Sequence, residues 1–557
     1  MYLQNYDPFS NPTLSTFVAS LPILVLLATL ASGRVGAVIA AFLGLLTATA
    51  CATLAFGMPI ELVLWSGVHG MIFAFFRVIW LIISAVFLYD ITVATGRFEI
   101  MKSSIAGLSG DRRIQAILVA FSFGAFIEGA AGFGAPVAIS AAFLVGLGFK
   151  PFESALLCLI ANTAPVAWGA IGTPIRTLAG VTGLDVEALS ATSGRILPFL
   201  SLILPFWLVK TMTTWSKTIE VWPALLVVGG SFAGAQFIWS NYVSFELVDI
   251  VSAVASLAAG VVLLRFWRPK HEWRFDHDEA ADVASRSEEA TTTISARPAE
   301  VGRAWMPFVL LTVAVLLWGI PRVKTTLDAA TSTQWSIPGL DCRVAKGEAV
   351  TGRAVPGPKD FETARADLVP VSSTGTAVFL AAVVSGLLLG LSPGTLIVML
   401  GRTVRRLLPA IAAISCMLSL GFVTKYSGMD VVLGLAFTQT GRMLYPIFGA
   451  LLGWLGVALT GSDTSSNILF GNLQKFTAQK LSLDPILMAA ANTTGGVMGK
   501  MIDAQSIVVA AAATGESGHE GRLLRAVLGH SIALALMVGG IVWVYAHWFP
   551  AGVAQPR

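Results

Sequence analysis

The chain has 557 residues, of which 55% are hydrophobic and only 12% are charged, with a formal net charge of +4. A soluble domain carries about 25% charged residues. This deficit excludes a soluble globular enzyme, a disordered chain and a nucleic-acid-binding protein with a basic face. We therefore predict an all-α polytopic membrane protein, embedded in lipid and without a nucleic-acid partner.

Apolar stretches that suit membrane helices recur along the whole sequence, since a spanning helix needs about 20 mostly apolar residues. They cover residues 14–31, 35–56, 71–89, 195–209, 222–239, 245–264, 304–320, 374–391, 407–423, 444–460 and 525–549. Two further apolar regions, 113–175 and 461–513, are interrupted by Gly, Pro, Asn and Thr. Together they predict about 12 to 14 spans or partial spans.

Two polar segments divide the chain. Residues 269–303 and 321–373 hold more than a third of all Lys, Arg, Asp and Glu side chains. The predicted organisation is a first transmembrane half at 1–268, a cytoplasmic polar loop at 269–303, a transmembrane helix at 304–320, an extracytoplasmic polar loop at 321–373 and a second transmembrane half at 374–557.

The distribution of Lys and Arg between the apolar stretches sets the expected orientation. It places the N-terminus and the 321–373 loop outside. It also requires residues 113–150 to enter and leave the membrane on the same face, as a re-entrant hairpin. No basic segment precedes the first apolar stretch, so we expect a mature span there rather than a cleaved signal.

One short motif occurs twice. Residues 161–169 read ANTAPVAWG and residues 491–499 read ANTTGGVMG, each after an apolar helical pattern. A Gly-rich acidic stretch precedes each copy, at 128–136 and at 460–467. Repeated halves with interrupted hydrophobic segments at matching positions are typical of secondary transporters, whose site lies at the repeat interface. We predict two inverted repeats, each with a re-entrant or broken helical segment.

The interruptions supply the predicted substrate site. Unwound backbone persists at membrane depth only inside protein or beside water, and the N-terminal ends of broken helices attract carboxylates. Nearby hydroxyls and amides complete the hydrogen bonds. The predicted ligands are Gly129, Gly132, Gly134, Asn162, Thr163, Ser462, Thr464, Ser465, Asn492 and Thr493. The alternative is that the glycines only allow close helix packing.

Two carboxyl groups inside the apolar regions are the candidates for proton coupling. Charges at membrane depth are costly and indicate function. Glu128 and Asp463 occupy matching places in the two Gly-rich stretches, and we predict that a proton binds there. In the alternative interpretation, each carboxyl is neutralised or ion-paired and holds its broken helix together.

Three cations are candidates for contact with an anionic substrate. They are Arg77 within an apolar run, Arg176 directly after the first interruption and Lys500 directly after the second. Arg77 would otherwise pair with Asp90 or Glu128. Arg176 and Lys500 would otherwise be end-of-helix charges that extend toward the interface.

The sequence contains no motif for metal binding or nucleotide binding. Its four cysteines, at positions 51, 158, 342 and 416, follow neither a metal nor a disulfide spacing. H-E-x-x-H and G-x-G-x-x-G are absent. We expect no enzymatic activity, no cofactor and no bound metal.

Several long motifs resemble the bacterial lactate permease family. They are QNYDPFSN (4–11), GAFIEGAAGFGAPVAISAAFLVGLGFKP (124–151), LCLIANTAPVAWGAIGTPI (157–175), GWLGVALTGSDTSSNILF (453–470) and AANTTGGVMGKMIDAQSI (490–507). The resemblance extends from the first ten residues to the last span and is weaker in the two polar loops.

The resemblance implies a multi-pass symporter of the bacterial inner (plasma) membrane that imports L-lactate, D-lactate and glycolate with protons. It also implies kinship with an ion-transporter superfamily whose Asn-Thr motifs lie near the substrate; here these are Asn162-Thr163 and Asn492-Thr493. Sodium-coupled dicarboxylate relatives in that superfamily carry Ser where this chain has Ala161 and Ala491, which favours protons. The alternatives are a sodium-coupled carboxylate transporter and a lactate-sensing membrane receptor. The sequence does not set the oligomeric state.

Overall fold

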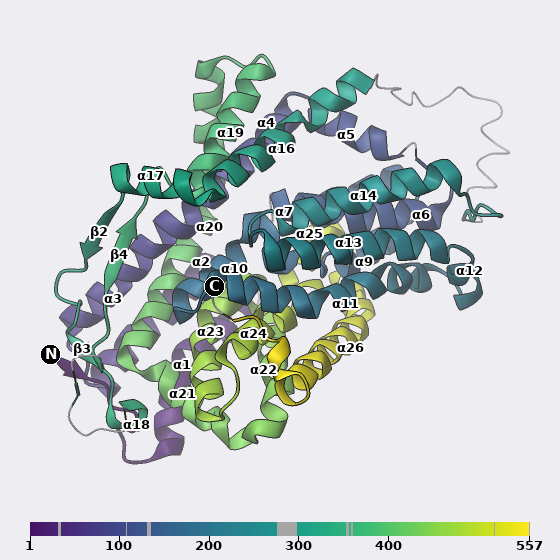
Figure 1. Cartoon of the computed structure of the whole chain (residues 1–557). Coiled ribbons are helices and arrows are strands. Elements are labelled where there is room, and N and C mark those ends of the chain that lie inside the picture. The colour runs from purple at the N-terminus through teal and green to yellow at the C-terminus, as the bar shows by residue number, and fades with distance from the viewer. Residues whose placement is uncertain are drawn as a thin grey trace.

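Long apolar helices account for most of the structure (Figure 1). The computed structural model describes residues 1–31, 35–106, 108–130, 135–275, 298–351, 356–357, 360–516 and 519–555. Within these ranges, eight helices are long and apolar enough to cross a membrane, and a pair bent by 65° can add a ninth. Five shorter apolar helices accompany them. The prediction of an all-α polytopic membrane protein is confirmed.

The first half of the chain consists almost entirely of helices and π-helical turns. Its elements up to the first interruption are β1 (Tyr2–Leu3), α1 (Pro12–Ala31), α2 (Ala37–Ala50), η1 (Cys51–Ala55), α3 (Ile60–Phe73), η2 (Ala74–Ile79), α4 (Trp80–Ala94), α5 (Arg97–Ala106), α6 (Arg112–Ala116), η3 (Ile117–Phe123), α7 (Gly124–Ala130), α8 (Ala135–Gly146) and α9 (Pro151–Ala161). After it come η4 (Val166–Trp168), α10 (Gly169–Thr182), α11 (Val186–Met212), α12 (Trp215–Glu220), α13 (Trp222–Tyr242) and α14 (Val248–Phe266).

The middle of the chain contains one apolar helix and a small polar region. Its elements are α16 (Pro298–Gly319), α17 (Pro321–Thr331), β2 (Thr333–Ser336), β3 (Val344–Ala345), α18 (Glu348–Thr351) and β4 (Arg365–Leu368). The helix predicted at 304–320 is therefore present and begins six residues earlier. Most of the 269–303 loop lies outside the described residues.

The second half returns to long helices. Its elements are α19 (Thr374–Leu388), α20 (Pro393–Ser427), α21 (Met429–Phe437), η6 (Thr438–Thr440), α22 (Gly441–Thr460), α23 (Asp463–Lys480), α24 (Pro485–Gly499), η7 (Lys500–Ile502), α25 (Ala504–Thr514), α26 (Glu520–His547) and η8 (Pro550–Gly552). The order of a helical hairpin, an interrupted helix and a long helix thus occurs in both halves, at 112–212 and at 441–547. The inverted orientation of the two halves stays a prediction.

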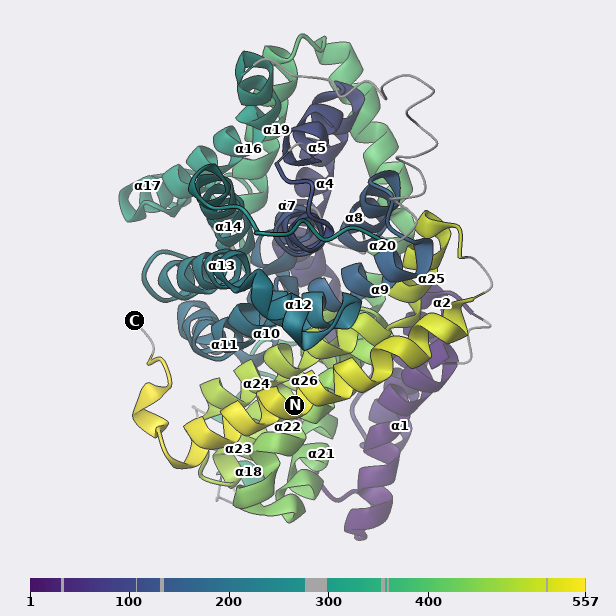
Figure 2. The same ribbon diagram turned by 90° about the vertical axis from the view of Figure 1, so that its right-hand side faces the viewer.

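Residues 112–146 form a helical hairpin, and its re-entrant character stays a prediction. The first arm runs through α6, η3 and α7, and the second arm is α8, which packs against η3 and α7. The Arg112 guanidinium at the start of the first arm donates to the carbonyl of Leu147, just after the second arm. Both ends of the hairpin therefore lie at the same side of the protein, as the charge distribution predicts. In Figure 2, α7 of the first arm lies near the centre of the molecule, surrounded by neighbouring helices.

Predicted cytoplasmic segments meet around one arginine. Arg113 is fully buried and pairs with Asp111 at 2.7 Å and with Glu220 at 3.0 Å. Its guanidinium also donates to the carbonyls of Lys217 and His271. Three parts of the chain that the positive-inside rule assigns to one face are thus joined by a single side chain.

The opposite end of the molecule carries the N-terminus and the 321–373 segment. β1 pairs in parallel with β3 through Tyr2 and Val344, and β2 pairs antiparallel with β4. The Gln4 amide donates to the carbonyls of Lys425 and Tyr426 at the end of α20. The N-terminus and the 321–373 segment therefore share one side, as the predicted topology requires.

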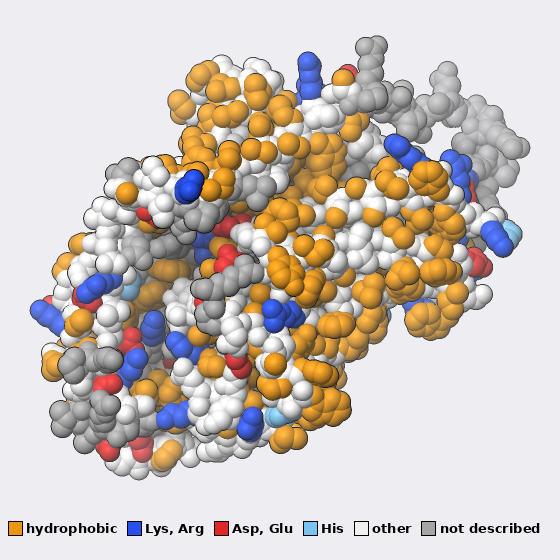
Figure 3. Space-filling model, in the orientation of Figure 1, with side chains coloured by type: hydrophobic (Ala, Val, Ile, Leu, Met, Phe, Trp, Pro, Cys, Tyr) orange, Lys and Arg blue, Asp and Glu red, His pale blue; other side chains and the backbone are white. Residues whose placement is uncertain are grey.

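The surface separates into an apolar and a charged part. In Figure 3, charged side chains gather near β2 and β4, whereas hydrophobic side chains dominate over α11, α13 and α14. Large apolar residues on these helices are strongly exposed, with Phe199 at 54% and Ile238 at 56%. Apolar exposure on this scale is typical of a surface that contacts lipid.

Candidate functional site

Glu128 lies on the last turn of α7, deep inside the protein. The helical stretch Arg112–Ala130 is 94% buried, so Glu128 faces protein rather than lipid. Its side chain is only 4% exposed, and Oε2 has no hydrogen-bond partner among the described residues. A Cβ placed on Gly169 would lie 2.6 Å from Oε1. Glu128 is therefore in direct contact with the start of α10.

The chain between α9 and α10 is unwound and buried. α9 ends at Ala161, with Asn162 as its C-cap, and the φ angles of Ala170, Ile171 and Gly172 are 45°, 57° and 74°. L-residues rarely adopt this left-handed conformation, and strained backbone of this kind is concentrated at functional sites. The helix is interrupted here, where the Gly and Pro pattern predicts a break.

Asn162 brings an unpaired amide into this interruption. Both Nδ2 and Oδ1 are buried and lack a hydrogen bond of regular geometry within the described part of the chain, although the amide lies beside the Glu128 carboxyl. Thr163 Oγ1 donates to the Ile160 carbonyl at 2.8 Å. Buried polar groups are nearly always paired, so the Asn162 amide is a group that a ligand can satisfy.

Asp463 occupies the equivalent break in the second half. Gly461, with φ +73°, ends α22, and Asp463 is the first residue of α23. The carboxyl is 3% exposed. Oδ2 accepts hydrogen bonds from Thr493 Oγ1 and, at 3.4 Å, from Asn467 Nδ2. Oδ1 has no partner among the residues described, and a Cβ on Gly496 would lie 2.4 Å from it.

The remaining polar residues of this break have mainly local partners. Ser462 Oγ accepts from the Ser465 amide at 3.3 Å and caps α23. Ser465 Oγ donates to Met417 Sδ at 3.0 Å. Asn492 Nδ2 donates to Asn467 Oδ1 at 2.9 Å. Thr464 is half-buried. Asn492 and Thr493 thus belong to one network with Asp463, whereas Ser462 and Ser465 stabilise the helix start.

Lys500 lies within electrostatic reach of both predicted proton-binding groups. Its ammonium donates to the Gly461 carbonyl at 2.7 Å and pairs with Asp503 at 3.3 Å. The Lys500 side chain is 6% exposed and that of Asp503 is 0% exposed. The charge of Lys500 acts on both the Glu128 and the Asp463 carboxyl. One buried cation therefore links the carboxyl groups of the two halves.

The interrupted segments of the two halves cross each other. η4 of the first half packs against α24, and η7 of the second half packs against α9. Asn467 Nδ2 donates to the Pro174 carbonyl at 3.3 Å, and Lys475 Nζ donates to the Thr182 carbonyl at 2.5 Å. The two copies of the repeated motif are therefore brought together in space.

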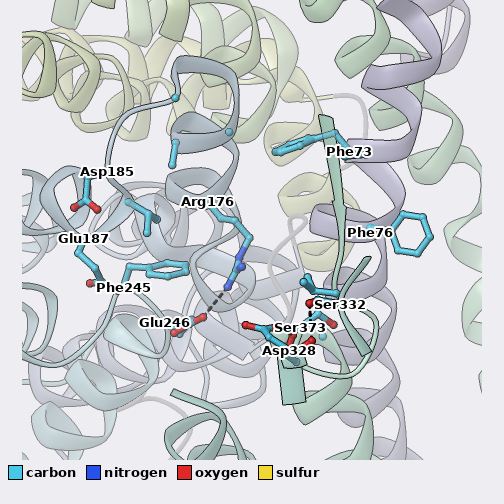
Figure 4. Close-up of a pocket in the computed structure, with 18 of the residues that line it drawn as sticks. Phe73, Phe76, Arg176, Asp185, Glu187, Phe245, Glu246, Asp328, Ser332 and Ser373 are labelled. Carbon is cyan, nitrogen blue, oxygen red and sulfur yellow. Dashed lines mark hydrogen bonds and ion pairs between the residues drawn. The ribbon is translucent and has the colours of Figure 1, made fainter. Parts of the chain in front are cut away.

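A large cavity of about 1290 Å³ opens on the side of the N-terminus. Arg176 of α10 projects into it and pairs with Glu246 at 2.6 Å (Figure 4). The Arg176 guanidinium also lies 4.7 Å from the centre of the Phe245 ring. Asp328 and Ser373 face the same space from the 321–373 segment (Figure 4).

The described candidates fall into two groups, one buried at the two interruptions and the other, Arg176, at the cavity. Glu128, Asn162 and Lys500 lie at one buried centre, and Asp463, Asn492 and Thr493 adjoin it. None of these six lines the cavity, which among the described candidates contains only Arg176.

Three predicted ligands lie outside the described residues or are described only in part. Gly132 and Gly134 fall outside the described ranges. The backbone of Arg77 belongs to η2, and its side chain lies outside the described part. Asp90, considered as a partner for Arg77, pairs with Arg406 at 2.8 Å.

Sequence reasoning missed three buried polar residues. Asn467 connects Asp463, Thr493 and Pro174, and Asp503 pairs with Lys500. Asp249, at the start of α14, is fully buried. It stands within the apolar stretch 245–264, so a search for every carboxyl inside an apolar stretch finds it.

Known proteins match this chain along nearly its whole length. The family model described as L-lactate permease matches residues 15–549. The glycolate permease GlcA of Escherichia coli K12 is 42% identical over 565 residues, covering 98% of each chain. The L-lactate permease of Bacillus subtilis is 43% identical over 561 residues, covering 98% of this chain and 99% of its own.

Among solved structures, that of the YdaH transporter of Alcanivorax borkumensis aligns with 87% of this chain and 87% of its own, with 14% identity and a TM-score of 0.44. The family model matches residues 15–549, and the two permeases are 42% and 43% identical over nearly their full length. These two findings establish the family. The chain belongs to the L-lactate permease family.

Proposed function

We propose that this protein imports L-lactate, D-lactate and glycolate across the bacterial inner membrane by proton symport. The observation that carries the proposal is the full-length similarity to relatives named L-lactate permease and glycolate permease, at 42% to 43% identity. Neither name is favoured by identity, so the proposal covers the class of short 2-hydroxymonocarboxylates.

The two interruptions are the proposed substrate site. The Asn162 amide lies beside Glu128, Asn492 and Thr493 belong to the network of Asp463, and the charge of Lys500 acts on both carboxyl groups. We propose that this set donates hydrogen bonds to one substrate carboxylate. A charge-assisted bond from Lys500 would be stronger than a neutral one. The outer cavity with Arg176 is the proposed route from the extracytoplasmic side to this site.

Glu128 and Asp463 are the proposed proton-binding groups. Each carboxyl has one oxygen without a partner in the described structure and lies within electrostatic reach of Lys500. One proton accompanying one lactate makes the step electroneutral. Without it, moving the anion inward against the membrane potential would cost about 2.3 kcal/mol per 100 mV. An inverted relation between the halves would let the two breaks exchange roles as access alternates.

Uptake of radiolabelled lactate into proteoliposomes tests the function. An imposed pH gradient, acidic outside, should drive accumulation, and glycolate should compete while succinate should not. Replacement of sodium by choline should leave uptake unchanged. Accumulation that follows the sodium gradient and ignores the pH gradient would establish sodium coupling instead.

Conservative variants test the proton-binding groups. Glu128→Gln and Asp463→Asn should each abolish gradient-driven accumulation. The matched control is Glu153→Gln, because Glu153 is partly exposed and its ion pair with Lys150 spans 3.8 Å. Gradient-driven uptake that persists in both Glu128→Gln and Asp463→Asn would refute this assignment.

A further inference from the structure

Asp249 is a buried carboxyl group that the proposed site does not use. It lies on the first turn of α14 and is 0% exposed. Neither Oδ1 nor Oδ2 has a hydrogen-bond partner among the described residues, and the start of α14 has no side-chain cap bond. The carboxyl therefore does not serve the helix end in the usual way. A carboxyl kept at such a position is costly and indicates a function.

The contact between α7 and α14 brings Asp249 next to the proposed proton site. A Cβ placed on Gly129 would lie 2.8 Å from Asp249 Cβ and 2.9 Å from Ile250 Cγ1. The two helices can therefore approach this closely only because residue 129 is glycine. Gly129 directly follows Glu128, and the Asp249 carboxyl interacts electrostatically with that of Glu128.

The surroundings of Asp249 leave Glu128 as its principal charged neighbour. Among the described elements, those that pack most extensively against α14 are α7, α10, α13 and η3. η3 has no ionisable side chain and α13 has only Tyr242, which is 68% exposed. α10 contributes Arg176, which pairs with Glu246. On α14 itself, Arg265 lies in the last turn, at the opposite end from Asp249.

We propose that Asp249 is a second proton-binding group of the first half and shares the coupled proton with Glu128 across the Gly129 contact. One proton moves from the Glu128 carboxyl to the Asp249 carboxylate, so the total charge of the pair is unchanged. Glu128 is then a carboxylate again and can accept the next proton. The inference rests on the proposed proton symport, and it adds a residue on a third element, α14, to the coupling machinery.

The test separates substrate exchange from proton coupling. Purified Asp249→Asn protein is reconstituted with an internal pH-sensitive dye, and two quantities are measured: lactate counterflow at equal pH and proton entry driven by a lactate gradient. We expect counterflow within about twofold of wild type, because exchange needs no net proton release. Lactate-driven proton entry should fall at least 10-fold, and uptake should lose its dependence on external pH.

Two further variants test whether a loss of proton coupling in Asp249→Asn comes from the missing carboxyl group. Ser252→Ala is the matched control on the same helix. Among the described residues, the Ser252 hydroxyl bonds only to the Val248 carbonyl of its own helix, so the change should leave both rates unchanged. Asp249→Glu restores a carboxyl and should restore proton entry with a shifted pH profile. Wild-type proton coupling in Asp249→Asn would overturn the proposal, and so would failure of a folded Asp249→Glu protein to couple when Asp249→Asn fails as well.

Measurements on the wild-type protein distinguish a failure of the proposed proton symport from a failure of the proposed role of Asp249. Lactate counterflow without any lactate-driven proton entry in wild-type protein would refute proton symport itself. Proton entry that is normal in wild type and unchanged in Asp249→Asn would refute only the role of Asp249.

Discussion

The side-chain amide of Asn467 in α23 donates a hydrogen bond of 3.3 Å to the backbone carbonyl of Pro174 in α10. The same amide bonds Thr493 at 3.1 Å and the Asp463 carboxyl at 3.4 Å. A single side chain of the second half thus holds the interrupted helix of the first half against the Asp463 site. This contact joins the interrupted segments of the two halves directly.

Replacing Asn467 by Ala should weaken both the fold and the site. The change leaves the Asn492 amide without its 2.9 Å acceptor and removes one donor from Asp463. A buried polar group left unpaired costs about 1–3 kcal/mol, so the thermal unfolding temperature of the detergent-purified protein should fall. Gln479→Ala, at an exposed position of the same helix, is the control. Equal unfolding temperatures for the two variants would contradict this role.

Adding one methyl group at Gly169 should disturb Glu128. The new Cβ would lie 2.6 Å from Glu128 Oε1, so the carboxyl must move. The initial rate of lactate uptake driven by a pH gradient should fall at least 10-fold in Gly169→Ala, a loss of about 1.4 kcal/mol or more in transition-state stabilisation. In the control Gly230→Ala, the nearest atom is 3.8 Å away and uptake should not change. Wild-type uptake by Gly169→Ala would show that the position of the carboxyl is unimportant.

Single and double variants of Lys500 and Asp503 separate the effect of this ion pair on stability from its effect on transport. Lys500→Met leaves the Asp503 carboxylate buried without its cation, and loss of one partner of a buried ion pair costs about 3–5 kcal/mol. The double variant Lys500→Met/Asp503→Asn should recover much of the unfolding temperature. It should still fail to accumulate lactate, because the cation for the substrate is missing. Transport restored together with stability would assign Lys500 a structural role only.

High pH should release the N-terminal segment before it affects the membrane helices. Burial raises the pKa of Tyr6 to about 12, despite the hydrogen bond from the Gly347 amide to its hydroxyl oxygen. A phenol with a raised pKa in the folded state stabilises the fold fully below its ordinary pKa of about 10. That stabilisation is lost as the pH rises toward 12.

Limited proteolysis of the N-terminus between pH 9 and 12 measures this release. Cleavage should increase above about pH 10 in wild type. Tyr6→Phe cannot ionise at this position, so the increase should be smaller in that variant, where Tyr2, whose pKa is also raised by burial, still ionises on release. Identical pH profiles for the two proteins would contradict the prediction.

The sequence predicts the architecture well because hydropathy dictates it. Apolar stretches, the hairpin at 113–150 and the interruptions after residues 161 and 460 all follow from the exclusion of unpaired backbone from lipid. Contacts between distant segments do not follow in this way. Nothing in the local pattern distinguishes Asn467 from the other polar residues of 460–467, because its role comes from Pro174, which lies 293 residues away.

The same limit applies to the charged candidates. Arg176 and Lys500 follow their interruptions in the same manner in sequence, yet Arg176 faces the outer cavity with Glu246 and Lys500 is buried with Asp503. Spacing along the chain determines where a helix ends. It does not determine whether the next side chain turns toward the cavity or toward the protein interior.

Ala170, Ile171 and Gly172 place a short left-handed turn at the start of α10, beside Glu128. A return of these residues to the right-handed conformation would change the direction in which α10 leaves the interruption. Rotation about a few backbone bonds can therefore change the angle between α9 and α10 without breaking either helix, and two non-glycine residues would be relieved of strain as it does. A transporter built this way can alter the width of its binding site while each span remains intact.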